Sequence, residues 1–222
     1  MNRMNNGITI EPSFTQNFQT VTLGMGCFWS PDALFGHLPG VVRTRVGYAG
    51  GTAANPTYRD MGDHSETVEI DYDPSMISLK EILNVFWSNH NPININGYKG
   101  KQYMSLILYR DKNQNEPIQQ VKQRQEQEKG KLETRVEPYS GFYLAEDRHQ
   151  KHYLKRYPNA IEKISTLYPS EEGLTNSTLA SRLNGLAKGY TNLEQIKNEI
   201  NQWPTSLHNR EMMVNLIKQI RW

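Results

Sequence analysis

Cys27, the only cysteine of the chain, is the residue best suited to nucleophilic chemistry. It follows an apolar, strand-like segment, and Gly24 and Gly26 allow the backbone to turn sharply around it. Ser30 and Pro31 favour a helix start just beyond it, with serine as the cap and proline at the first helical position. The positive end of such a helix favours the reactive thiolate. Position alone also fits a buried structural cysteine, because free cysteine commonly packs as a small apolar residue.

Glu66 is the candidate proton donor. The segment that begins at Glu66 alternates, so that Val68, Ile70 and Tyr72 share an apolar face while residues 67, 69 and 71 face water. By this parity Glu66 points inward, where burial raises the pKa of a carboxyl group and lets it carry a proton near neutral pH. The pattern alone leaves open a solvated position at the edge of the strand.

Two aromatic rings and two phenols could complete a substrate site around the thiol. Phe28 and Trp29 could enclose a small apolar group, although either ring alone is typical of an ordinary core. Tyr58 and Tyr103 offer hydroxyl groups from polar segments, and each taken singly fits an ordinary surface tyrosine.

The histidines leave other chemistries open. A cysteine hydrolase or acyl transferase needs a base beside the thiol, and five histidines are available for that role: His37, His64, His90, His149 and His152. None of them lies in a recognisable partner motif. Glu146, His149 and His152 also have a helical spacing that could hold a metal, but no complete ligand set accompanies them. We therefore favour surface pairing and expect no metal.

The elements that must position these residues follow the order strand, helix, strand, strand, helix, strand. They are expected at residues 19–23, 32–38, 41–48, 66–72, 79–89 and 103–109, and Ser78 with Glu81 forms a capping box for the second helix. This order predicts an α/β (α+β) fold, a ferredoxin-like split β-α-β sheet with helices on one face.

The rest of the chain is expected to be helical. Residues 112–131, rich in Gln, Glu and Lys, predict a solvated surface helix. Beyond Pro158 three apolar stripes predict three short helices, the second behind a capping box at residues 191–194. We expect an N-terminal extension (1–18), a catalytic domain (19–158) and a helical C-terminal appendage (159–222) that docks on it. Deleting residues after about 160 should then preserve the chemical step if the core stays soluble.

Charge and composition narrow the function classes. The 222 residues include 25 basic and 23 acidic ones, a net charge of +2, so we expect no nucleic-acid partner. One cysteine excludes an intrachain disulfide. The polar N-terminus lacks the apolar core of a signal peptide, and no apolar run approaches the ~20 residues of a membrane span. We expect a soluble, cytoplasmic protein that does not bind membranes.

Taken together, the motifs resemble those of the A-type peptide methionine sulfoxide reductases. The similarity covers residues 19–158 and keeps the family's order of motifs. The matching stretches are GMGCFWS at 24–30, LPGV at 38–41, GYAGG at 47–51, NPTYRD at 55–60, HSETVEIDYDP at 64–74, VFWSNHNP at 85–92, QYMS at 102–105 and YLAEDRHQKHYL at 143–154. Several separated motifs in one order make chance agreement implausible.

The resemblance implies a ferredoxin-like core and reduction of the S epimer of methionine sulfoxide, free or in oxidised proteins, as in the repair of oxidative damage. No metal or organic cofactor is implied. Carried over residue by residue, it implies Cys27 as the nucleophile that becomes a sulfenic acid, Glu66 as the acid that protonates the sulfoxide oxygen, Tyr58 and Tyr103 as hydrogen-bond donors to that oxygen, and Phe28 with Trp29 as the pocket for the methyl group.

The chain also departs from the family pattern. Ser30 stands where glycine is usual, and the stretch 94–101 is short and lacks an aspartate that many members carry. The recycling cysteines common in the family's C-terminal tail are absent, so the chain resembles the one-cysteine subset. An external thiol such as glutaredoxin, thioredoxin or a small thiol must then reduce the sulfenic acid. We expect a monomer. A cysteine hydrolase or acyl transferase, and a non-catalytic module that binds oxidised methionine, remain alternatives.

Overall fold

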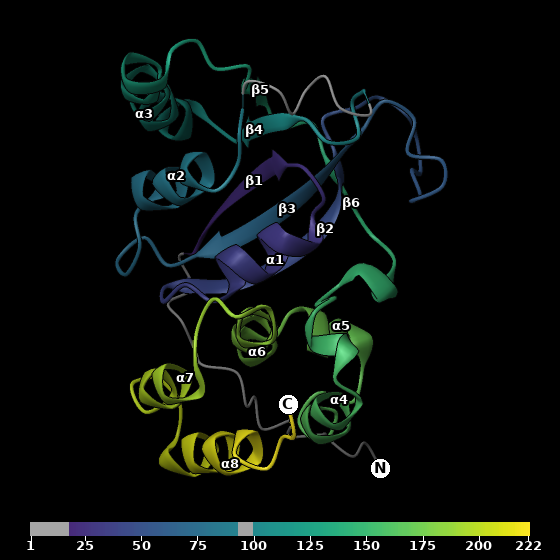
Figure 1. Cartoon of the computed structure of the whole chain (residues 1–222), viewed down its shortest axis with the longest axis vertical. Helices are drawn as coiled ribbons and strands as arrows, with labels where there is room; N and C mark the ends of the chain where they lie inside the picture. The colour runs from purple at the N-terminus through teal and green to yellow at the C-terminus, as the bar shows by residue number, and fades with distance from the viewer. Residues whose placement is uncertain (1–17, 93–99) are drawn as a thin grey trace, which may run out of the picture.

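A six-stranded sheet in the order β5-β4-β1-β3-β2-β6 forms one layer of the protein. The computed structural model describes residues 18–92 and 100–222, and Figure 1 shows helices α4 to α8 gathered below the sheet. The strands are β1 (Gln19–Met25), β2 (Val41–Ala49), β3 (Ser65–Tyr72), β4 (Ser105–Tyr109), β5 (Arg135–Pro138) and β6 (Phe142–Leu144). All neighbouring strands pair antiparallel except β4 and β5, which are parallel.

The six elements predicted for the core are all present, with ends shifted by a few residues. Helix α1 (Trp29–Gly36) joins β1 to β2, and α2 (Leu79–Ser88) joins β3 to β4. The central strands β4-β1-β3-β2 are antiparallel to one another, which is the arrangement that two split β-α-β units produce. The predicted α/β class is confirmed. The ferredoxin-like assignment stays a prediction, because β5 and β6, which the sequence analysis missed, extend the sheet on both sides.

Both helices pack on the same face of the sheet. Val21 of β1, Ile70 of β3, Phe35 of α1 and Ile82 of α2 belong to one core cluster and are inaccessible to solvent. Each fully buried side chain of this kind contributes about 1.5–3 kcal/mol. The capping box of α2 is confirmed, since the Ser78 hydroxyl accepts from the Glu81 backbone N–H at 3.3 Å and the Glu81 carboxylate accepts from the Ser78 backbone N–H at 2.8 Å.

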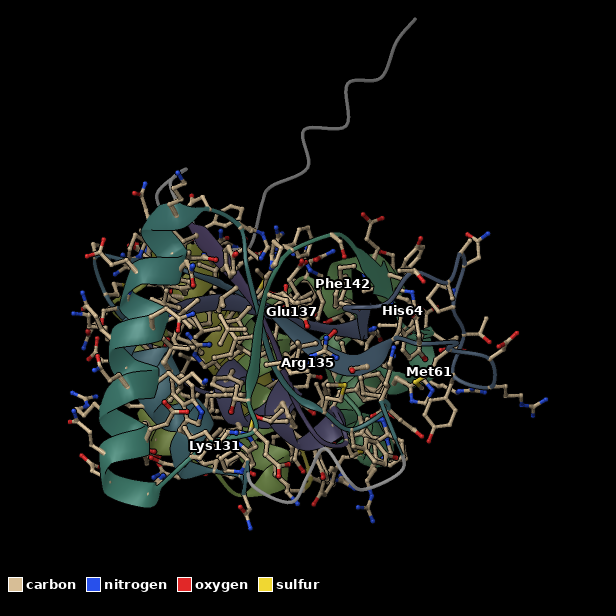
Figure 2. The ribbon with its side chains drawn as sticks, turned by 90° about the horizontal axis from the view of Figure 1, so that it is seen from above. Met61, His64, Lys131, Arg135, Glu137 and Phe142 are labelled. Atoms are coloured by element: carbon tan, nitrogen blue, oxygen red, sulfur yellow. The ribbon has the colours of Figure 1, made fainter. Side chains whose placement is uncertain are left out.

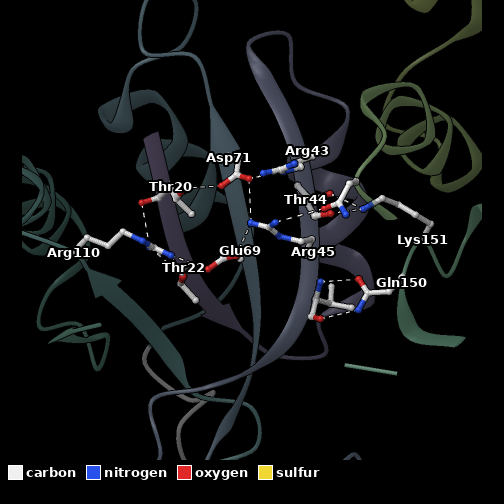
Figure 3. A network of polar contacts seen from close by, with 12 residues as sticks. Thr20, Thr22, Arg43, Thr44, Arg45, Glu69, Asp71, Arg110, Gln150 and Lys151 are labelled. Carbon is white, nitrogen blue, oxygen red and sulfur yellow. Dashed lines mark hydrogen bonds and ion pairs between the residues drawn. The ribbon is translucent and has the colours of Figure 1, made fainter. Parts of the chain in front are cut away.

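The opposite face of β3 is buried as well, so the prediction that residues 67, 69 and 71 face water is wrong. Glu69 and Asp71 are 8% and 1% exposed. Arg45 donates to Glu69 at 2.7 Å and to Asp71 at 3.0 Å, while Arg43 donates to Asp71 and Arg110 to Glu69 (Figure 3). The alternating polar residues mark an ion-pair network and not contact with solvent.

The start of α1 also differs from the prediction. Trp29 is its first residue, Phe28 precedes it, and no side chain caps this end. The Ser30 hydroxyl lies 3.1 Å from the Tyr153 hydroxyl. The cap predicted at Ser30 is therefore wrong, because a tertiary contact engages its side chain.

The loop between β2 and β3 carries Tyr58 and is held by a histidine. His64 Nδ1 accepts from the Gly51 backbone N–H at 3.1 Å, so the proton lies on Nε2, which donates to the Ala53 carbonyl at 2.8 Å. Figure 2 places Met61 and His64 on the side of the molecule opposite α3 (Lys112–Lys129), the surface helix that the sequence predicts.

Five helices lie between Pro158 and the C-terminus, where three were predicted. They are α4 (Pro158–Ile164), α5 (Glu171–Thr175), α6 (Thr178–Lys188), α7 (Leu193–Ile200) and α8 (Leu207–Ile217). These helices enclose a second core that includes Leu179, Ile196 and Met213. The capping box expected at residues 191–194 is wrong, since Asn192 caps α7 by accepting from the Gln195 backbone N–H at 2.9 Å.

Helix α6 docks these helices on the sheet layer. Its Arg182 is fully buried and donates to the carbonyls of Gly36 and Val41 at 2.7 and 2.8 Å. The same guanidinium pairs with Glu199 at 2.7 Å, so one side chain joins α1, β2 and α7. In the described ranges, no helix combines the length and the apolar character that a membrane crossing requires.

Candidate active site

Cys27 lies in the turn between β1 and α1, and its side chain is exposed. Gly26 has a φ of 93°, a conformation that favours glycine, so it makes the turn as predicted. Gly24 instead lies within β1, where a Cβ would stand 2.9 Å from the Met104 carbonyl oxygen. That glycine permits close packing between strands and does not make the turn.

The thiol is not biased toward the thiolate in the free protein. Partial removal of the sulfur from water raises the pKa of Cys27; the backbone N–H of Trp29 lowers it, and the charge of Glu66 raises it further. The start of α1 therefore acts in the predicted direction, but burial and the carboxylate outweigh it. The predicted lowering of this pKa is wrong.

Glu66 points into the protein, as its strand parity predicts, and is 1% exposed. Its Oε2 accepts from the backbone N–H of Phe28 at 3.0 Å, and its Oε1 accepts from the Gln102 side chain at 2.9 Å. The solvated edge position is excluded. The bond to Phe28 links the carboxyl group to the residue that directly follows Cys27, so the two candidate reactive groups lie together.

Phe28 and Trp29 differ in their surroundings. Phe28 is 1% exposed, and its ring centroid lies 6.0 Å from that of Tyr48 and 5.3 Å from that of His149. Trp29 is half-buried and stacks on His152 with centroids 3.6 Å apart and rings nearly parallel. Phe28 is thus part of the core, whereas Trp29 is available to a ligand.

The two predicted phenols are both half-buried. The Tyr58 ring lies 4.6 Å from that of His149, and its backbone N–H donates to Glu146 at 3.2 Å. Tyr103 directly follows Gln102, the residue that hydrogen-bonds Glu66. Tyr58 thus contacts His149, which also contacts Phe28, whereas Tyr103 is next in sequence to a residue bonded to Glu66. The stretch 94–101, which lacks the aspartate, lies outside the described residues except for 100 and 101.

The sequence analysis missed a polar pair beneath the site. The Tyr48 hydroxyl donates to Glu146 Oε2 at 2.7 Å, and burial together with this bond raises the pKa of Tyr48. Tyr48 also stands opposite Glu66 in the β2–β3 register. Its place in the GYAGG stretch was a usable signal, but strand periodicity alone marks it as a core residue.

The five histidines considered as a base have other contacts. His37 bonds the Leu34 carbonyl at 2.6 Å and His90 bonds the Phe86 carbonyl at 2.7 Å, while His64 holds its loop. His149 and His152 contact Trp29. None of these ring nitrogens hydrogen-bonds the Cys27 sulfur in the part of the chain that the structure describes. This geometry disfavours a cysteine hydrolase.

The spacing of Glu146, His149 and His152 does not produce a metal centre. Glu146 binds Tyr48 and Tyr58, and the two histidines flank Trp29. Across residues 18–92 and 100–222, no group of three His, Cys, Asp or Glu side chains could hold a metal ion. A cavity of about 620 Å³ lies at the C-terminal end of α1, lined by His37 and residues of α7, and contains none of the predicted site residues.

Comparisons with known protein sequences all match the same family. A sequence profile described as Peptide methionine sulfoxide reductase matches residues 19–181. A peptide methionine sulfoxide reductase of Drosophila melanogaster is 44% identical over 183 residues, covering 81% of this chain and 72% of the relative. Peptide methionine sulfoxide reductase MsrA of Photobacterium profundum is 41% identical over 167 residues, covering 69% and 79%.

Solved structures agree. Methionine sulfoxide reductase A of Corynebacterium diphtheriae is 32% identical with a TM-score of 0.56, over 65% of this chain and 77% of that one. Reduced Mxr1 of Saccharomyces cerevisiae is 26% identical with a TM-score of 0.59, over 65% and 88%. The sequence match extends beyond residue 158 into α6, the helix that carries Arg182.

Proposed function

The chain belongs to the peptide methionine sulfoxide reductase family, and we propose that it reduces methionine-S-sulfoxide, free or in proteins, through Cys27 and an external thiol. The observation that carries this proposal is the position of Glu66. A buried carboxyl group bonded to the residue after the nucleophile can deliver a proton to a sulfoxide oxygen held against the thiol.

The reaction needs one thiolate and one proton donor at the same time. The charge of Glu66 raises the pKa of Cys27, so the protonation states of the two groups are linked. When Cys27 and Glu66 hold one proton between them and that proton is on Glu66, the site contains both the thiolate and the proton donor that the reaction requires. Attack by the thiolate on the sulfoxide sulfur, with proton transfer to its oxygen, is then possible without a histidine base.

The other predicted residues hold the sulfoxide in this geometry. Trp29 supplies the accessible wall for its methyl group and the buried Phe28 ring backs the pocket from the core side, while the hydroxyls of Tyr58 and Tyr103 donate to its oxygen. Donors aimed at the oxygen stabilise the negative charge that develops there as the sulfur is attacked. Burial of the methyl group fixes which epimer presents its oxygen to Glu66.

The electron balance requires a second substrate. The sulfoxide sulfur gains two electrons and leaves as the thioether of methionine, while the Cys27 sulfur loses two and retains the oxygen as a sulfenic acid. One external thiol then displaces water to form a mixed disulfide, and a second releases Cys27 as a disulfide of the reductant. A single cysteine leaves no intrachain route. We infer a small cellular thiol, glutaredoxin or thioredoxin as the reductant, acting on a cytoplasmic monomer.

A single-turnover assay with the separate enantiomers of methyl p-tolyl sulfoxide, without added thiol, tests the proposal. The wild-type protein should convert the S enantiomer to the sulfide, and Cys27→Ser should not, because a hydroxyl group is a poor nucleophile toward sulfur. Since Cys27 is exposed, this variant should keep the wild-type circular dichroism and melting curve. Binding of the sulfoxide without conversion would favour the binding module, and ester hydrolysis that needs Cys27 would favour the hydrolase.

A further inference from the structure

A series of buried hydrogen bonds, the His90 network, joins helix α2 to strand β4 and to the residue before β5. The Trp87 indole nitrogen lies 3.0 Å from the Thr134 hydroxyl, which lies 2.8 Å from the Ser105 hydroxyl. The Ser105 hydroxyl lies 2.8 Å from His90 Nε2, and His90 Nδ1 lies 2.7 Å from the Phe86 carbonyl oxygen. Trp87 and Ser105 are inaccessible to solvent, and Thr134 is 4% exposed, so water does not compete for the bonds in the middle of the series.

Each of these bonds has one possible direction. A carbonyl oxygen can only accept, so His90 carries a proton on Nδ1. Burial lowers the pKa of His90 to about 4, so near neutral pH its Nε2 is unprotonated and accepts from the Ser105 hydroxyl. Ser105 has then used its only hydroxyl hydrogen and accepts from Thr134, whose oxygen accepts from the Trp87 N–H. The polar hydrogens of all four side chains are matched, and their orientations are fixed.

The residues just before Ser105 form part of the candidate active site. Gln102 is bound to Glu66 twice, since its carbonyl oxygen accepts from the Glu66 backbone N–H at 2.8 Å and its side chain donates to the Glu66 carboxylate at 2.9 Å. Ser105, the first residue of β4, belongs to the His90 network. Tyr103 therefore lies in a stretch, 102–105, that β3 holds at one end and the His90 network holds at the other.

Regular strand pairing ends at the same point. In the part of the chain that the structure describes, β4 pairs with β1 from Ser105 onward and with β5 from Leu106 onward. Tyr103 precedes both pairings, although β4 itself lies between β1 and β5 in the sheet (Figure 1). The Ser105 hydroxyl thus ties the last paired position of β4 to α2 and to Thr134.

We propose that His90 and Ser105 are positioning residues, which fix the start of β4 so that the Tyr103 hydroxyl faces the sulfoxide oxygen. This rests on the proposed function, in which Tyr103 donates to that oxygen. A hydroxyl donor is effective only within narrow limits of distance and angle. A small rotation of the main chain at Ser105 would therefore take the phenol out of reach of the oxygen while leaving the rest of the pocket in place.

Equilibrium binding to the Cys27→Ser protein tests the proposal without turnover. The two probes are the S enantiomer of methyl p-tolyl sulfoxide and methyl p-tolyl sulfide, which lacks the oxygen. Ser105→Ala interrupts the His90 network, so Kd for the sulfoxide should rise about three-fold to ten-fold, the effect of losing one hydrogen bond, while Kd for the sulfide stays the same. The matched control is Ser181→Ala, because Ser181 is also inaccessible and its hydroxyl donates to the Ser177 carbonyl at 3.0 Å. This control should change neither Kd. An equal loss for sulfoxide and sulfide would overturn the proposal.

A double-mutant cycle with Tyr103→Phe separates positioning from a general loss of stability. Tyr103→Phe should weaken sulfoxide binding by a similar factor, and adding Ser105→Ala should cause no further loss, because the donor that the network positions is already gone. His90→Phe keeps a ring but makes neither hydrogen bond, so it should behave like Ser105→Ala. Losses that simply add would overturn the proposal, as would a Tyr103→Phe or His90→Phe protein that binds the sulfoxide as tightly as its parent.

A second measurement is independent of substrate. In protein labelled with ¹⁵N-histidine, the ring signals of His90, assigned from His90→Phe, should show the neutral tautomer with its proton on Nδ1 near neutral pH. Ser105→Ala should shift the Nε2 signal, because this nitrogen loses its donor. A proton on Nε2 instead would overturn the proposal. If no sulfoxide is bound or converted, the proposed function fails and the proposal with it. If sulfoxide binds but the Ser105 and His90 variants match their parent, only the proposal fails.

Discussion

The local backbone and the surroundings of Cys27 shift the pKa of its thiol in opposite directions. The N–H of Trp29 favours the thiolate, while burial and the charge of Glu66 favour the thiol. If the reaction requires a single proton on Cys27 and Glu66 together, the plot of rate against pH should be bell-shaped. The two apparent pKa values of that curve describe the pair and not either residue alone. The raised pKa of Cys27 in the free protein is therefore compatible with catalysis, provided that Glu66 takes part in the same titration.

Glu66→Gln separates the two groups. The amide keeps the shape and can still accept from the Phe28 N–H, but it has no proton to transfer, so the single-turnover rate should fall about ten-fold to a thousand-fold. Sulfoxide affinity should change less. The remaining rate should rise with pH as the thiol ionises and should show no alkaline fall. Glu128→Gln, an exposed site on α3, is the control. An unchanged rate with the same alkaline limb would mean that another group donates the proton.

The cysteine count predicts the stoichiometry of the first half-reaction. Without added thiol, one enzyme should convert about one equivalent of methionine sulfoxide, because the sulfenic acid has no partner cysteine in the chain. Mass spectrometry should find the added oxygen on Cys27 and a dimedone adduct at the same residue. A yield near two methionines per chain without thiol would contradict this scheme.

Residue patterns predict the candidate reactive groups but not the contacts that hold them. Cys27 and Glu66 were recognised from a local turn and from strand parity. Tyr48 and Glu146 are 98 residues apart, and Trp29 and His149 are 120 apart, so neither pair leaves a periodic signal. The pKa of the thiol was also mispredicted, because the partial removal of the sulfur from water outweighs the effect of the adjacent helix start.

Among the secondary-structure elements, strand β3 shows what the alternation of apolar and polar residues can and cannot predict about burial. The apolar side of β3 was predicted residue by residue, but its polar side is buried against arginines of β2 and the residue after β4. Alternation shows that the two faces of a strand differ chemically. It does not separate a solvated charged face from one buried in an ion-pair network, which is the case in β3. Strands β5 and β6, of four and three residues, are too short for any periodicity to be read.

The network on this face can be tested at Asp71. Asp71→Asn removes the charge that Arg43 and Arg45 share, and the free energy of unfolding measured in urea should fall by roughly 1–3 kcal/mol, since the carboxylate is buried but both arginines are partly exposed. Glu211→Gln, exposed on α8, should change it little. A loss no larger than that of the control would show that the network does not stabilise the sheet.

For the whole molecule, the division expected at residue 158 is less sharp than the composition suggests. The later helices have their own core, yet α6 supplies Asn184, whose side chain donates to Asp32 at 3.2 Å and accepts from the Leu154 N–H at 3.0 Å. Asp32 in turn binds Lys151, next to the histidines that flank Trp29. Composition shows where a second core begins, but it cannot show that one helix serves both cores. Cutting the chain after residue 160 would thus remove partners of buried groups in α1.

Arg182→Met tests this connection in the full-length chain. Loss of the guanidinium leaves two buried carbonyls and Glu199 without their donor, so the protein should be less stable by about 3–5 kcal/mol, the cost of breaking a buried ion pair. Lys218→Met, on the exposed surface near the C-terminus, is the control. Since Arg182 contacts the C-terminal end of α1 and Cys27 precedes its N-terminal end, the single-turnover rate per folded molecule should be unchanged. A lower rate in fully folded protein would mean that α6 also positions the reacting groups, and that the helices beyond residue 158 are part of the catalytic unit.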